Sequence, residues 1–113
     1  MANYTVTGLR ENQPFEQTTQ ETGTNTISDV FTLTTPAKIS DLQWMLPSGD
    51  TLTVTIDFEG DGTHTTTLYT STATSGAALS GRSFRTGDKL TVAITGGTSG
   101  AKAYGLQFEA HRA

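Results

Sequence analysis

Residues 49–70, GDTLTVTIDFEGDGTHTTTLYT, contain the pattern that decides the fold. In the first half of this stretch, apolar side chains alternate with polar ones, a period of two that is typical of a half-buried β-strand. The apolar side chains on the shared face are Leu52, Val54, Ile56 and Phe58. Residues 59–62, EGDG, tolerate the positive φ angles that a chain reversal needs. The stretch is therefore predicted to form a long antiparallel hairpin.

The turn and first strand of this hairpin are repeated later in the chain. The pattern Gly-Asp-x-Leu-Thr-Val-x-Ile occurs at residues 49–56 and again at residues 87–94. Two copies of one turn-plus-strand unit predict a meandering antiparallel sheet, and no segment has the apolar spacing of a helix. About eight strands are expected, at residues 3–9, 27–35, 38–46, 51–58, 63–70, 82–85, 89–95 and 101–110. The predicted fold class is all-β, an antiparallel, jelly-roll-like β-sandwich with almost no helix.

Length and composition predict a single domain over residues 1–113 with a thin core. Leu, Ile, Val and Phe together number only 22, whereas Thr, a residue that favours strands, occurs 24 times. The absence of cysteine excludes disulfides and thiolate metal sites, and no cofactor is expected. Without an apolar run or a signal peptide, we expect synthesis in the cytoplasm and no membrane span.

Charge is divided unevenly along the chain. Residues 1–59 hold eight acidic and two basic side chains, a net of -6, whereas residues 60–113 hold five basic and three acidic ones, a net of +2. This asymmetry could join copies head to tail, with Arg82 and Arg85 as candidate partner contacts. We favour the alternative that strands from both halves interleave and mix the charges.

Residues 10–26 form a polar stretch that is long for an ordinary connection. Phe15 is its only apolar anchor, and Glu11 and Glu16 flank that residue. Because such a segment has little of its own to bury, we expect an arm that crosses a subunit boundary with Phe15 in a pocket of the neighbour. The alternative is that Phe15 packs on its own domain.

Asp57, Glu59 and Asp61 precede Gly62 at alternate positions, as ligands do at the start of a calcium loop. Position twelve of such a loop would be Leu68, where an EF-hand needs a bidentate Glu, so a hairpin tip is the better interpretation and weak calcium binding the alternative. The two histidines have no metal-ligand spacing, and no nucleophile motif is present, so we do not expect an enzyme.

Trp44, Tyr69 and Tyr104 could form an aromatic platform for sugar rings. For Trp44 we favour core packing, because Leu42 and Leu46 share its predicted face. A nucleic-acid partner is not expected, because the isoelectric point of about 4.9 provides no basic field.

The Thr- and Gly-rich strands GDTLTVTIDFEGDG and GDKLTVAITGG resemble those of small β-sandwich virion proteins of tailed bacteriophages, of the head decoration or cement type. The resemblance implies a virion protein that clamps neighbouring capsid subunits, with the major capsid protein or other virion proteins as partners, and a homo-oligomer, often a trimer. The alternative is a carbohydrate-binding or adhesion module, since sugar-binding modules share this strand style.

Overall fold

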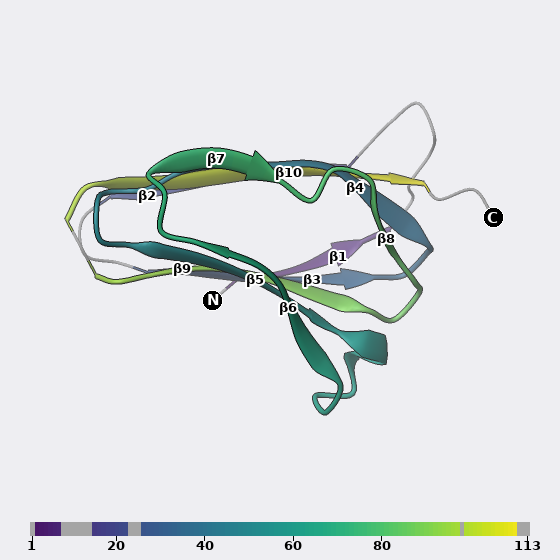
Figure 1. Ribbon diagram of the computed structural model, residues 1–113. Helices are drawn as coiled ribbons and strands as arrows, with labels where there is room; N and C mark the ends of the chain where they lie inside the picture. Colours follow the sequence, from purple (N-terminus) through teal and green to yellow (C-terminus); the bar gives the residue numbers. More distant parts are fainter. Residues whose placement is uncertain (1, 8–14, 23–25, 98, 111–113) are drawn as a thin grey trace.

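The computed structural model describes residues 2–7, 15–22, 26–97 and 99–110, and it has two β-sheets packed face to face (Figure 1). The first sheet has the strand order β1 (Ala2–Val6), β3 (Ile27–Leu33), β9 (Lys89–Thr95), β5 (Thr51–Asp57) and β6 (Thr65–Ser71). The second has the order β2 (Phe15–Thr22), β10 (Ala101–Ala110), β4 (Ala37–Met45) and β7 (Ser75–Ala78), and β8 (Arg82–Phe84) also pairs with β4. The predicted all-β sandwich is confirmed, and the helical part of the described chain is the 3-10 turn η1 (Phe58–Gly60).

The two strands of the repeated unit are neighbours in the first sheet. Strands β5 and β9 pair antiparallel, and Val54 lies opposite Val92 at the centre of the pairing. The large apolar side chains of both strands point into the sandwich and are buried: Leu52, Val54, Ile56, Leu90, Val92 and Ile94. The predicted antiparallel hairpin is confirmed by the pairing of β5 with β6, but the predicted meander is wrong, because β9 lies between β3 and β5, which are not its neighbours along the chain.

The core lies between the sheets and is rich in aromatic rings. The ring of Phe108 on β10 lies 5.9 Å from that of Phe31 on β3 and 6.1 Å from that of Phe84 on β8. All three side chains are buried, and full burial of one such side chain stabilises a fold by about 1.5–3 kcal/mol. These contacts join the two sheets, with β3 in the first and β10 and β8 in the second.

Ten strands are present in the described part of the chain, two more than expected. The polar stretch 10–26, predicted as an arm or loop, contains β2 in the second sheet, so that prediction is wrong for residues 15–22. Strand β7 lies between the strands expected at residues 63–70 and 82–85, where no strand was predicted. The interleaving of the two halves is confirmed, because β9 lies between β3 and β5 and β10 lies between β2 and β4.

Candidate binding surfaces

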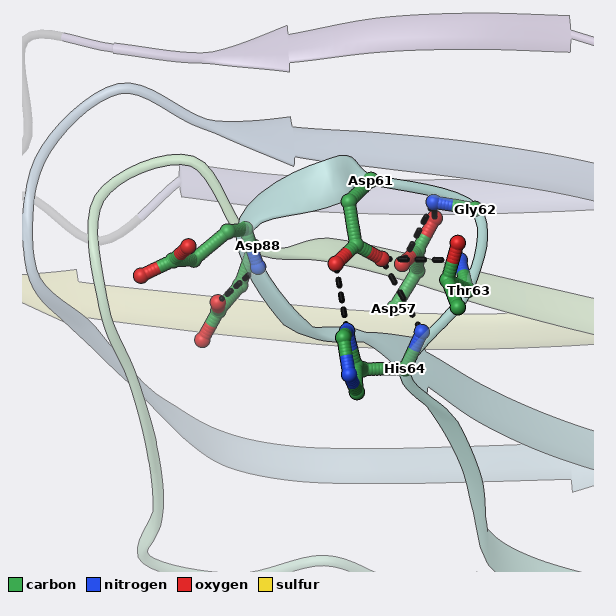
Figure 2. A network of polar contacts seen from close by, with 7 residues as sticks. Asp57, Asp61, Gly62, Thr63, His64 and Asp88 are labelled. Atoms are coloured by element: carbon green, nitrogen blue, oxygen red, sulfur yellow. Dashed lines mark hydrogen bonds and ion pairs between the residues drawn. The ribbon is translucent and has the colours of Figure 1, made fainter.

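The acidic stretch 57–61 forms the tip of the β5–β6 hairpin (Figure 2). Both carboxylate oxygens of Asp57 accept hydrogen bonds from the backbone N–H of Gly62, at 3.1 and 2.9 Å. Asp61 accepts from the backbone N–H groups of Thr63 at 2.8 Å and His64 at 2.9 Å. These carboxylates therefore hold the turn, and the hairpin-tip interpretation is confirmed.

A buried carboxylate ties this tip to the turn before β9. Asp88 is 2% exposed and accepts hydrogen bonds from the backbone N–H groups of Glu59 and Arg85, each at 2.9 Å. Glu59 has a φ of 58°, a left-handed conformation that is uncommon outside glycine. The bond from its N–H to Asp88 joins the base of the tip to the turn before β9.

The ring of His64 lies beside Asp61 at the surface, with Nδ1 2.5 Å from Oδ2 (Figure 2). Hydrogen bonds from the His64 backbone, the His64 ring and the Thr63 backbone hold the pKa of Asp61 well below its usual range. The side-chain hydrogen bond and the charge of Asp61 raise the pKa of His64 above 6.5.

No group of three His, Cys, Asp or Glu side chains in the described ranges could hold a metal ion, so Asp57, Glu59 and Asp61 do not form the calcium-loop cluster.

The outer face of the second sheet is hollowed into a shallow groove of about 580 Å³. Its floor is made by the small residues Ala103 and Gly105 of β10, between β2 and β4. Polar side chains line its walls and bond to one another: Gln107 Nε2 donates to Glu16 Oε1 at 2.6 Å, and Gln43 Nε2 donates to Asp41 Oδ2 at 2.7 Å. The groove can therefore offer carboxylate and amide groups to a polar ligand.

The aromatic side chains that could stack on sugar rings are not all available. Trp44 is 4% exposed, and its Nε1–H donates to the carbonyl oxygen of Ala73 at 3.2 Å. Tyr104 is also buried, and its hydroxyl donates to the carboxylate of Asp29, which accepts from Thr19 Oγ1 as well. Burial, followed by the bond to Asp29, raises the pKa of Tyr104. Core packing of Trp44 is confirmed, and burial of Trp44 and Tyr104 leaves neither ring free to stack on a sugar.

The partner contacts predicted from the sequence lie on two opposite edges of the second sheet. Phe15 and Glu16 begin β2 at one edge, and Arg82 begins β8 at the other, with Arg85 just after it. One row of paired residues connects the two edges: Phe15 pairs with Phe108, Phe108 with Ile39, and Ile39 with Arg82. Glu16, Arg82 and Arg85 are exposed, whereas Glu11 and the side chain of Phe15 lie outside the described residues.

A buried ion pair was not anticipated from the sequence. Lys102 Nζ lies 2.9 Å from Asp50 Oδ2, and the two side chains are 1% and 0% exposed. Lys102 lies on the same face of β10 as the buried residues Tyr104, Leu106 and Phe108. This alternation could have predicted from the sequence that its side chain is buried. Its partner could not be identified in that way, because Asp50 belongs to the turn before β5.

Comparisons of the chain with protein-family models, curated proteins and solved structures found no match. No helix in the described part of the chain is long and apolar enough to cross a membrane.

Proposed function

We propose that this chain is a non-enzymatic structural subunit of a virion, of the capsid decoration type, and that the open edges of its second sheet bind neighbouring subunits. The observation that carries the proposal is that the two outermost strands of one sheet, among the described residues, form open edges of opposite charge. Strand β2 carries Glu16 at one edge, and Arg82 and Arg85 lie at the other. A strand at an open edge presents backbone N–H and C=O groups that can pair with another chain.

The strand directions allow the sheet to continue from one copy into the next. Strand β10 runs antiparallel to both β2 and β4, and β4 runs antiparallel to both β7 and β8. Strands β7 and β8 therefore run antiparallel to β2, so β2 of a second copy placed beside them would extend an antiparallel sheet. Such head-to-tail contacts close into a ring if the rotation between copies allows it, and a trimer is the form we propose.

The lengths and charges of the two edges also match. Strand β2 has 8 residues, and β7 and β8 together present 4 and 3 residues along the same side of β4. Glu16 and Arg82 lie in adjacent rows of the sheet at its two edges, since Glu16 pairs with Gln107 and Arg82 with Ile39. Adjacent rows face opposite sides of a sheet, so these two side chains would not meet directly, but opposite charges at the two edges still favour contact between unlike edges over contact between like edges.

In a capsid, surfaces that the ring leaves free would bind the major capsid protein or another virion protein, and the mature location would be the virion. The test is to sediment particles from cells that produce this chain together with the capsid of its virion through a density gradient, and to probe each fraction with an antibody against the chain. The proposal expects the chain in the capsid-sized fraction in amounts comparable to the capsid protein. Recovery of the whole pool as a free 12.0 kDa chain or a small oligomer would contradict it.

The second candidate is a carbohydrate-binding module, which the groove on the outer face of the second sheet favours. Its acidic and amide side chains are suited to hydrogen-bonding sugar hydroxyls, and its volume of about 580 Å³ lies within the usual range of ligand pockets. A glycan array separates the two candidates. Two results together would favour this alternative. The chain would bind a glycan and lose that binding in Gln43→Ala and Gln107→Ala, and it would never sediment with particles.

A further inference from the structure

The buried pair Asp50–Lys102 joins the two sheets at one end of the sandwich. Asp50 ends the turn that leads into β5 of the first sheet, and Lys102 lies near the start of β10 in the second. Lys102 follows the inward alternation of β10, which directs its stem between the sheets. Its Nζ reaches to 2.9 Å from Asp50 Oδ2.

The loop between β9 and β10 covers this pair. A Cβ atom placed on Gly96 would lie 2.5 Å from Asp50 Oδ1, so the glycine backbone packs directly on the carboxylate. A Cβ atom on Gly100 would lie 3.0 Å from the ring of Pro47, which precedes Asp50 in the turn. With side-chain exposures of 1% and 0%, the two groups are shielded from water.

An ion pair is a poor final state for Lys102 in this position. Although Nζ is within ion-pair distance of Asp50, it makes no hydrogen bond with any residue that the structure describes. An ammonium group has three N–H donors, and burying it without hydrogen bonds carries a large desolvation penalty.

We propose that Asp50 and Lys102 condense into an intramolecular isopeptide bond. A proton passes from the Nζ ammonium to the Asp50 carboxylate, which converts the ion pair into an amine and a carboxylic acid. The amine nitrogen then attacks Cγ of Asp50, an N–C bond forms, and a C–O bond breaks. The hydroxyl leaves with a proton from the nitrogen as one water molecule, and no oxidant or reductant is needed.

The amide removes both buried charges and leaves one N–H and one C=O in place of the ammonium and the carboxylate. It also links the start of β5 to the start of β10, so the chain between them becomes a closed loop. A cross-link of this kind restricts the unfolded chain and raises resistance to heat and denaturant. The inference does not depend on the proposed virion function.

Intact-mass spectrometry of the purified full-length chain tests the inference. The wild type is expected to be lighter than its sequence by one water molecule, whereas Lys102→Met and Lys102→Arg should have their sequence masses. Lys89→Arg is the matched control, because Lys89 lies on β9 outside the buried pair, and it should retain the loss of water.

Trypsin mapping locates the missing water without relying on any variant. The cross-link should block cleavage after Lys102 and yield one branched peptide that joins residues 39–82 to residues 90–112. Asp61–Gly62 can lose a water by forming a cyclic imide, and such a loss would leave residues 90–102 as a free linear peptide. A wild-type chain at its full sequence mass, or a loss of water that maps to residues 61–62, would overturn the inference.

Discussion

Asp50 and Asp88 follow the two glycines of the repeated unit, and both are buried, at opposite ends of the paired strands β5 and β9. Their partners differ. Asp88 accepts backbone N–H bonds from Glu59 and Arg85, whereas Asp50 faces the ammonium group of Lys102. One repeated sequence thus produces a turn-holding carboxylate at one end of the sandwich and an inter-sheet contact at the other.

Removal of the Asp88 carboxylate should destabilise the fold substantially. Asp88→Ala removes the buried acceptor of two backbone N–H groups, and hydrogen bonds to charged groups contribute roughly 1.5–3 kcal/mol each. We expect the free energy of unfolding, measured by urea denaturation, to fall by about 3 kcal/mol. Asp57→Ala is the matched control at the exposed tip and should cost less than about 1 kcal/mol. Equal losses for the two variants would contradict this role of Asp88.

The His64–Asp61 pair should make the hairpin tip sensitive to pH. The folded-state pKa of His64 is raised above 6.5. The stability that protonated His64 adds to the folded protein is therefore fully present below pH 6.5 and is lost as pH rises through the higher folded-state pKa. The pKa of Asp61 is lowered in the folded protein. The stability that ionised Asp61 adds is therefore present above the ordinary pKa of an Asp side chain and is lost only in strong acid.

An NMR titration of the His64 ring measures this effect directly. The Asp61→Asn variant should show a lower His64 pKa than the wild type, because the hydrogen bond to a carboxylate and its charge are both removed. His111 provides an internal reference in the same spectra. An unchanged His64 titration in Asp61→Asn would show that the contact does not exist in solution.

Calcium should leave the stability of the protein unchanged. The carboxylates of Asp57 and Asp61 are already occupied by backbone N–H groups of the turn, which a cation would have to displace. We expect equal melting temperatures in calcium and in EDTA, by differential scanning fluorimetry. A shift of several degrees would revive the calcium-loop interpretation, since ligands that bind the native state raise its melting temperature.

Gly96 should tolerate substitution less well than Gly62, although both have positive φ. An added Cβ meets Asp50 Oδ1 at 2.5 Å in the first case and nothing within 4 Å in the second. Gly62→Ala should therefore cost about 1–2 kcal/mol from backbone strain alone, and Gly96→Ala about 2 kcal/mol more. Thermal unfolding of the two variants side by side checks the difference, and a smaller loss for Gly96→Ala would contradict the packing of the loop on Asp50.

Much of the fold could be predicted because apolar alternation marks most of the strands. Leu52, Val54 and Ile56 show it in β5, and Leu90, Val92 and Ile94 repeat it in β9. Strand β2 lacks this signal, because Phe15 is the only large apolar residue of FEQTTQET, and its strand form depends on pairing with β10. Strand β7, SGAA, likewise has only small residues and pairs with β4.

The contacts that define the candidate surfaces were harder to predict. The turn role of Asp57 and Asp61 is local and could be read from the spacing of Asp and Gly. The pairing of Asp50 with Lys102, and the placement of Glu16 and Arg82 on opposite edges of one sheet, depend on which strands become neighbours. Periodicity gives the face that a residue occupies but not the strand beside it.

Sedimentation velocity with charge-reversal variants tests most directly whether the second sheet continues from one copy into the next. Wild-type chain should self-associate, whereas Glu16→Lys alone and Arg82→Glu/Arg85→Glu alone should each associate at least about tenfold more weakly. An equimolar mixture of the two variants should recover association in part, because every contact between unlike variants again joins opposite charges, although a ring of three always retains one contact between identical variants. Association that neither variant weakens, or a mixture that stays monomeric at concentrations where the wild type associates, would contradict the claim, as would a wild type that remains monomeric throughout.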